Sequence, residues 1–290
     1  MANTTAIVQQ EKKKLGMTAY LNSEAIKNNI MSVIGEKDYN GFVTAIVSAV
    51  QTNKDLAQCT NQSILSAALL GQTLKLSPSP QLGQYYMVAY ENKGVKEATF
   101  QLGWHGAVQL AMRSGQYRKI NVLDVREGEL ISFNPFSESY NFEPITDPTE
   151  REKAKVVGYY AFFELLNGFR KELYWTREQM ESHAKQYSKG YKSDITKGTS
   201  YTFWSKNFNE MAKKTMLRQL ISKWGIMSTE FQTAYNGDQS VVREDGSFDY
   251  VDNTVDIETV EADVIESANK KPIVENANFD NDVLPDFMKG

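Results

Sequence analysis

The chain has 290 residues, of which 41% are hydrophobic and 23% are charged, as is ordinary for a globular protein. Its single cysteine, Cys59, excludes an intramolecular disulfide, and its net charge of −4 argues, as an average, against DNA binding. The charge is segregated, however. Residues 1–223 carry 28 basic and 21 acidic groups, whereas residues 224–290 carry 4 basic and 15 acidic groups. This asymmetry predicts a body that binds a polyanion, followed by an acidic tail.

The N-terminal residues contain no apolar run of signal-peptide length. No apolar run elsewhere approaches the roughly 20 residues of a membrane span. We therefore expect a cytoplasmic protein with no membrane partner.

The first third of the chain has a helical pattern. Ser23 is a suitable N-cap for a first helix, residues 35–40 break the pattern, and Asn61 is a suitable cap for a third helix. Two prolines within residues 76–80 stop that helix. The helices are expected within 22–34, 42–52 and 62–74.

The middle of the chain has the composition of short strands. A glycine-containing connection predicts a hairpin over 84–102, and Asn167-Gly168 predicts a second hairpin over 156–175. Thr176 is a suitable N-cap for a following helix. The other expected elements are a helix over 103–114, strands over 120–125 and 130–133, loops over 134–153 and 189–199, and helices over 177–188 and 201–224.

These elements predict an α+β fold: N-terminal helices, a central core of small antiparallel sheets or hairpins with helices packed on it, a long basic C-terminal helix, and a disordered acidic tail. The domains are expected to be a flexible N-terminus (1–20), a core for binding and self-association (21–225) and the tail (226–290). The apolar residues at the end of the tail resemble a short docking peptide, and a tail that only keeps the protein soluble is the alternative.

Residues 182–223 combine cations with aromatic side chains. Nine residues are basic, two are acidic, and six aromatic residues lie among them. Spaced cations neutralise phosphates, and planar side chains stack on bases. The alternative is a solvated helix face with a few core aromatics, and core packing is the better interpretation of Trp204.

The sequence contains no phosphate-binding P-loop, no dinucleotide fingerprint and no nucleophile elbow. His105 and His183 lie far apart and lack metal-ligand spacing. His105 has a motif-like context, GlyTrpHisGly, and a structural role is the better interpretation of this lone histidine. Carboxylates within 84–175 lack diagnostic pairing, although a metal-dependent nuclease stays an alternative. We expect no enzyme and no cofactor, with Mg²⁺ only as a counterion of DNA.

Three segments together resemble the RecT family of phage and prophage single-strand annealing proteins. They are LLGQTLKLSPSPQLGQYYMVAY (69–90), FQLGWHGAVQLAMRSGQYRKI (100–120) and SYTFWSKNFNEMAKKTMLRQLISKWG (200–225). The resemblance covers about residues 25–225. It implies an ATP-independent recombinase that binds single-stranded DNA and anneals it into duplex as a homo-oligomeric ring or helical filament.

The resemblance also implies partners and site residues. The partners are an exonuclease that supplies the single strand and a host single-strand binding protein. By this resemblance, Arg113 of the RSGQ motif and Lys213, Lys214 and Arg218 of the EMAKKT-x₂-R motif are expected to contact DNA. A basic scaffold that meets an acidic protein is a second alternative. From charge and aromatic character alone, the further candidates for DNA binding are Lys185, Lys189, Lys192, Lys197, Lys206, Tyr191 and Tyr201.

Overall fold

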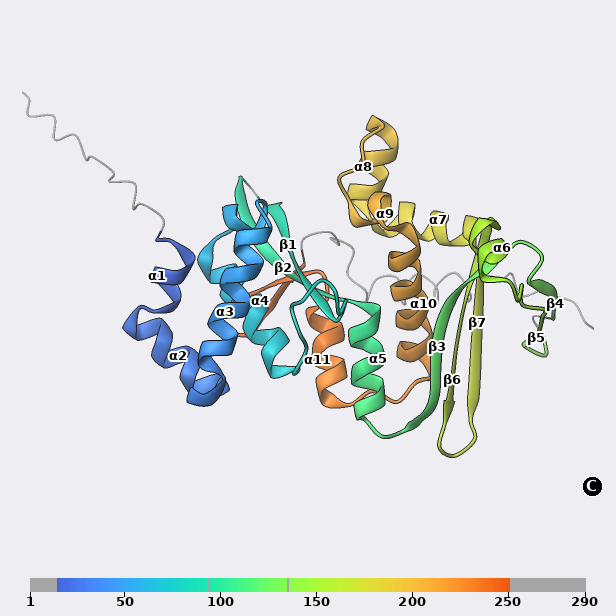
Figure 1. Ribbon diagram of the computed structural model, residues 1–290, viewed down its shortest axis with the longest axis horizontal. Coiled ribbons are helices and arrows are strands. Elements are labelled where there is room, and N and C mark those ends of the chain that lie inside the picture. Colours follow the sequence, from blue (N-terminus) through green and yellow to red (C-terminus); the bar gives the residue numbers. More distant parts are fainter. Residues whose placement is uncertain (1–14, 93, 135, 251–290) are drawn as a thin grey trace, which may run out of the picture. The chain divides into compact units, whose positions relative to one another are not determined.

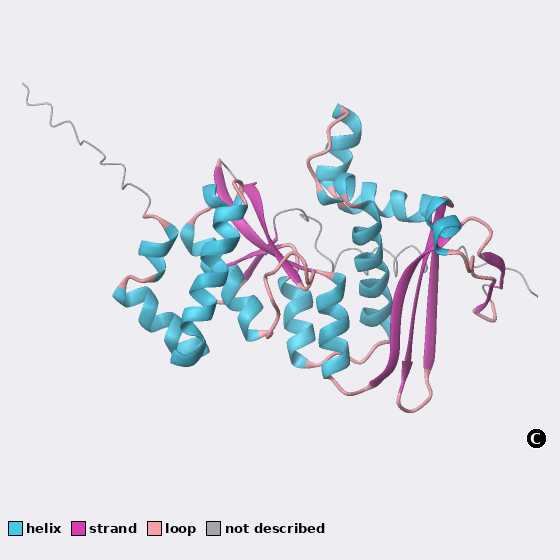
Figure 2. Ribbon diagram, in the orientation of Figure 1, coloured by secondary structure: helices cyan, strands magenta, loops and turns pink. Residues whose placement is uncertain are grey.

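The computed structural model describes residues 15–92, 94–134 and 136–250. Most of the N-terminus predicted to be flexible, residues 1–14 of 1–20, lies outside the described residues. Within the described part, helix α1 begins at Met17. Contacts divide the chain into residues 1–252 and residues 253–290, and all described residues belong to the first unit. The unit combines helices with small antiparallel sheets, which confirms the predicted fold class (Figures 1 and 2).

The N-terminal helices form where apolar residues recur at helical spacing. Ser23 is the N-cap of α2, as predicted, and Gly35 alone separates α2 from α3 because its φ of 84° suits glycine. The expected break over 35–40 is therefore too long. The cap of α4 is Thr60, whose hydroxyl accepts the Ser63 N–H, and not Asn61. These elements are α1 (Met17–Leu21), α2 (Glu24–Ile34), α3 (Glu36–Thr52), η1 (Leu56–Gln58) and α4 (Asn61–Thr73).

The first predicted hairpin is confirmed as β1 (Tyr85–Asn92) and β2 (Val95–Leu102), which pair in register from Tyr85↔Leu102. Helix α4 packs on this hairpin and places Ile64 and Ala67 in the core. The complete sheet has the order β1-β2-β8-β9, so strands from the end of the described chain close it.

These closing strands correct the predicted tail. Residues 226–250 contain α11 (Thr229–Gly237), β8 (Ser240–Val242) and β9 (Phe248–Tyr250). Phe231 and Ala234 of α11 are buried, and α11 contacts α5 and β2. The folded unit therefore continues beyond residue 225. The prediction failed because acidic composition was taken as a sign of disorder, and the rest of the predicted tail, 251–290, lies outside the described residues.

The second sheet has the order β3-β6-β7, and its β6–β7 hairpin turns at Asn167-Gly168 as predicted, with φ 88° at Gly168. Helices α7 and α10 cover one face, where Tyr159 and Phe163 are fully buried. Helix α5 packs against α10 and against α11, so it joins the two sheets. The elements are α5 (Trp104–Arg113), β3 (Tyr117–Arg126), β6 (Val156–Leu165), β7 (Arg170–Thr176) and α10 (Phe208–Trp224).

Three connecting regions differ from the predictions. The expected loop 134–153 contains β5 and α6, and the expected loop 189–199 is helix α8. Ser188 caps α8, and Gly198 ends it in the left-handed conformation. The expected helix 201–224 breaks at Asn207 into α9 and α10. The elements are β4 (Leu130–Asn134), β5 (Ser139–Phe142), α6 (Pro148–Lys153), α7 (Arg177–Tyr187), α8 (Lys189–Lys197) and α9 (Phe203–Lys206). Among the described helices, none has the length and apolar character needed to span a membrane.

Candidate nucleic-acid interface

Helices α7, α8 and α9 form a lysine arm, which we define as residues 177–206 (Figure 1). It contains six basic and three acidic residues. All five of its lysines are exposed, and within the described chain four of them have no ion-pair partner. The arm therefore offers cations that are not already neutralised by the protein. The four are Lys185, Lys192, Lys197 and Lys206, and the fifth exposed lysine is Lys189.

A buried carboxylate holds the arm together. Asp194 is 3% exposed and accepts the hydroxyls of Thr199 (2.7 Å), Thr202 (2.8 Å) and Ser205 (2.7 Å). It also accepts the backbone N–H groups of Tyr201 and Thr202, at 3.0 and 2.8 Å. These bonds, first that of Thr199, hold the pKa of Asp194 well below its usual value. The loop between α8 and α9 is thus fixed around an ionised side chain.

The two tyrosines predicted to stack on bases lie in different surroundings. Tyr191 is half-buried, and its ring packs 6.0 Å from Trp204 and 6.1 Å from Phe208. Tyr201 is 78% exposed. Trp204 is 8% exposed, which confirms its interpretation as a core residue. Of the two, Tyr201 is the residue that a base can reach without rearrangement of the core.

Lys214 and Arg218 of α10 are bound within the protein. Their side chains donate to the two carboxylate oxygens of Asp238, at 2.7 and 2.8 Å. Asp238 also accepts the Leu102 backbone N–H at 2.9 Å, and its side chain is 2% exposed. Arg218 stacks on Tyr235, 3.8 Å from the ring centroid. Burial lowers the pKa of Lys214, although the negative charge of Asp238 acts in the opposite direction.

This cluster, which we call the Asp238 clamp, ties β2, α10 and the end of α11 together. It gives Lys214 and Arg218 a structural role that the sequence did not indicate. Their contact with DNA stays a prediction, and its alternative is that both side chains serve only to bind Asp238.

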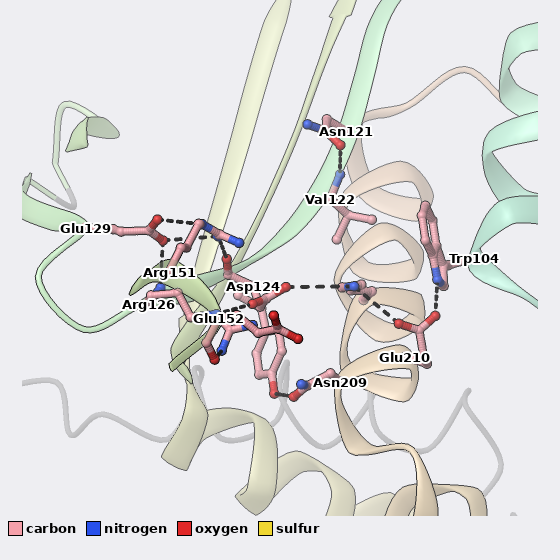
Figure 3. Close-up of polar contacts among 12 residues, drawn as sticks. Trp104, Asn121, Val122, Asp124, Arg126, Glu129, Arg151, Glu152, Asn209 and Glu210 are labelled. Atoms are coloured by element: carbon pink, nitrogen blue, oxygen red, sulfur yellow. Dashed lines mark hydrogen bonds and ion pairs between the residues drawn. The ribbon is translucent and has the colours of Figure 1, made fainter. Parts of the chain in front are cut away.

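Lys213 lies in a separate polar network at the start of α10. Figure 3 labels its neighbours Asp124, Glu210 and Trp104. Its ammonium group is 3.2 Å from Glu210 and 3.8 Å from Asp124, and it lies 5.6 Å from the centroid of the Trp104 ring. Glu210 in turn accepts the indole N–H of Trp104 at 2.5 Å. The charge of Lys213 is therefore partly neutralised, and Trp104 is held in one orientation.

Arg113, the remaining predicted cation, binds backbone carbonyls at the C-terminus of α4. Its guanidinium donates to the Leu74 carbonyl at 2.9 Å and to the Lys75 carbonyl at 3.5 Å, although the side chain is exposed overall. Cations at a helix C-terminus interact favourably with the helix dipole. The structure thus separates the predicted site residues. The lysine arm gathers seven of them, its five lysines together with Tyr191 and Tyr201, whereas Arg113, Lys213 and the clamp lie elsewhere.

The sequence did not identify a row of aromatic residues that joins β1, α5 and α9. Phe203 lies 6.1 Å from Tyr86, and Trp104 lies 3.6 Å from His105, measured between ring centroids. A Cβ atom built on Gly83 would lie 2.6 Å from His105 Nδ1 and 3.1 Å from the Tyr86 hydroxyl, so both side chains lie against Gly83, where a larger residue would displace them. We call Phe203, Tyr86, His105 and Trp104 the aromatic row.

Two glycines explain why α5 presents these rings. A Cβ atom on Gly103 would lie 2.0 Å from the Gly83 carbonyl oxygen, and one on Gly106 would lie 2.1 Å from the Gln84 carbonyl oxygen. Only glycine allows α5 to begin this close to the backbone before β1. The signal in the sequence was the GlyTrpHisGly motif, whose two glycines flank the two aromatic residues.

His183 of α7 is half-buried. Its ring packs against Trp175 (5.3 Å) and Tyr187 (4.5 Å). Burial, followed by the charge of Arg218, lowers the pKa of His183 to about 4. Throughout the described residues, no group of three or more His, Cys, Asp or Glu side chains is placed to hold a metal ion.

Comparison with known proteins gives relatives along most of the chain. The model of the RecT family matches residues 40–255. The uncharacterized protein YqaK of Bacillus subtilis (strain 168) is 36% identical over 254 residues, which are 88% of this chain and 81% of that protein. Protein RecT of Escherichia coli (strain K12) is 27% identical over 248 residues, which are 84% of this chain and 86% of that protein.

Proposed function

Because this chain belongs to the RecT family of single-strand annealing proteins, its general role is in DNA recombination, and we propose that it binds single-stranded DNA through the lysine arm and anneals complementary strands without ATP. The observation that carries the proposal is the set of exposed lysines on α7, α8 and α9, of which four have no ion-pair partner in the described chain.

Annealing requires that each strand be held while its base edges stay free to pair. Contacts to phosphates meet this need, because they fix a strand without reading its sequence. Lysines spaced along an arm neutralise successive phosphates and release their counterions. Watson–Crick pairing then supplies the free energy of the reaction, so ATP hydrolysis is not required.

The small size of the arm implies that several subunits act together. One subunit would hold only a few nucleotides, and its affinity alone would be modest. Many subunits along one strand raise the effective affinity by multivalency. We therefore propose a homo-oligomer, as a ring or a helical filament, whose product is duplex DNA. An exonuclease that generates the single strand and a host single-strand binding protein are its proposed partners, and residues 251–290 are the candidate docking segment.

The test is annealing of two complementary oligonucleotides, one with a fluorophore and one with a quencher, in EDTA and without nucleotide. The test variant combines Lys192→Ala, Lys197→Ala and Lys206→Ala. The control removes the same charge from exposed lysines on other elements. It combines Lys37→Ala, Lys54→Ala and Lys153→Ala.

We expect the wild type and the control to anneal the strands and the arm variant to lose most of this activity. Equal activity of the arm variant and the control would overturn the proposed site. Shortened strands after addition of Mg²⁺ would favour the nuclease alternative. Failure to bind any oligonucleotide, together with binding to an acidic protein, would favour the scaffold.

A further inference from the structure

The aromatic row is a surface feature that phosphate binding leaves unexplained. His105 is exposed, and Tyr86, Trp104 and Phe203 are half-buried. Phe203 is about a hundred residues from the other three rings in the chain, yet it lies 6.1 Å from Tyr86. The neighbouring residues Trp104 and His105 pack on each other at 3.6 Å. Aromatic side chains that gather at the surface of a folded protein commonly mark a binding site.

The surroundings of the row favour a planar ligand that carries negative charge. Lys206 is three residues after Phe203 on α9, so the two side chains lie on the same side of the helix. Lys213, whose charge Glu210 and Asp124 partly neutralise, lies at the other end, 5.6 Å from the Trp104 ring. Glu210, an acidic residue in contact with Trp104, is bound by Lys213 and by the indole N–H. An apolar peptide would not need these cations, whereas a nucleotide uses both the rings and the charges.

We propose that the aromatic row stacks on the unpaired bases of a DNA strand. The protein would therefore bind a single strand that carries bases more tightly than a sugar-phosphate backbone without bases. This inference rests on the proposed function and assigns the base-binding part of the same interface. Stacking tolerates any base sequence, because every base has a π-face. In a duplex the bases are already stacked on each other, so the row would release them as pairing proceeds.

Glu210 acts as a positioning residue in this scheme. Its carboxylate holds the Trp104 ring by one hydrogen bond and acts on the bases only through that ring. Glutamine retains an oxygen that accepts the indole N–H, whereas alanine does not. Glu210→Gln should therefore keep the preference for bases, and Glu210→Ala should reduce it.

The experiment compares two oligonucleotides of equal length and charge, one with bases and one built from abasic sites. Binding is measured by fluorescence anisotropy for the wild type, for His105→Ala and for the double variant Tyr86→Ala/His105→Ala. His105 is exposed, so its replacement should leave the fold intact, as circular dichroism can verify. The matched control is Phe136→Ala, which removes an aromatic side chain that is 97% exposed and lies outside the row.

We expect the wild type and Phe136→Ala to bind the base-bearing strand at least about 5-fold more tightly than the abasic strand, as one stacked base would require. The row variants should lose affinity only for the base-bearing strand. A wild type without preference for bases, or variants weakened equally on both strands, would overturn the inference. The proposed function fails separately, if loss of the arm lysines leaves binding of both strands unchanged.

Discussion

Replacement of Asp238 by alanine is expected to destabilise the protein strongly. The carboxylate is 2% exposed and binds Lys214, Arg218 and the Leu102 N–H within 2.9 Å. Its removal leaves the side chain of Lys214, which is 11% exposed, as a buried charge without a partner. Breaking a buried pair in this way costs about 3–5 kcal/mol. We expect a loss of this size in the free energy of unfolding.

The assay is urea unfolding followed by circular dichroism at neutral pH. Glu244→Ala is the matched control, because it removes an exposed acid from the same segment and should change stability by less than about 0.5 kcal/mol. Lys214→Met combined with Asp238→Asn should cost less than the sum of the single variants, with a coupling of about 1 kcal/mol or more. A cost below about 1 kcal/mol for Asp238→Ala, or strict additivity, would refute the clamp.

Three further predictions concern the interface and its support. His183 has a folded pKa of about 4 and an unfolded pKa near 6.5, so the folded state resists protonation. The contribution of His183 to the free energy of unfolding is therefore complete above about pH 6.5, and about 2–3 kcal/mol of it is lost toward pH 4, after allowance for partial exposure. In thermal melts measured at several pH values, His183→Gln should weaken this pH dependence. An unchanged pH dependence in the variant would contradict the prediction. Asp194→Ala should speed hydrogen exchange throughout residues 189–206 and weaken binding of single strands, and unchanged exchange would show that the carboxylate does not organise the arm. Gly106→Ala should cost about 1–3 kcal/mol in urea unfolding, because its Cβ would lie 2.1 Å from a backbone oxygen of Gln84, and a neutral result would mean that α5 shifts freely.

Much of the fold could be predicted because its signals are local. Asn167-Gly168 fixed a hairpin, and Thr176 forms a capping box with Gln179 at the start of α7. Helix α8 was missed because Gly190 and its several lysines resemble a loop, while the residues that stabilise it act from outside the helix. Ser188 caps it, and the Asp194 bonds reach forward to residues 199–205.

The functional residues were harder to predict because charge alone does not show what a side chain contacts. Lys214 and Arg218 looked the same in the sequence as Lys192, yet a carboxylate 20 or more residues away binds the first two. Asp238 was counted as part of an acidic tail for the same reason. The aromatic row depends on contacts between distant segments, and only the glycines of GlyTrpHisGly indicated them.

The most direct test of the account is the salt dependence of single-strand binding, measured with a short oligonucleotide. For single strands, the slope of log K against log salt changes by about 0.7 for each phosphate contact. The variant without Lys192, Lys197 and Lys206 should lower the slope by about 2, whereas Lys214→Met should leave it unchanged. The opposite pattern, with a lower slope for Lys214→Met and an unchanged slope for the arm variant, would show that DNA contacts α10 and not the lysine arm.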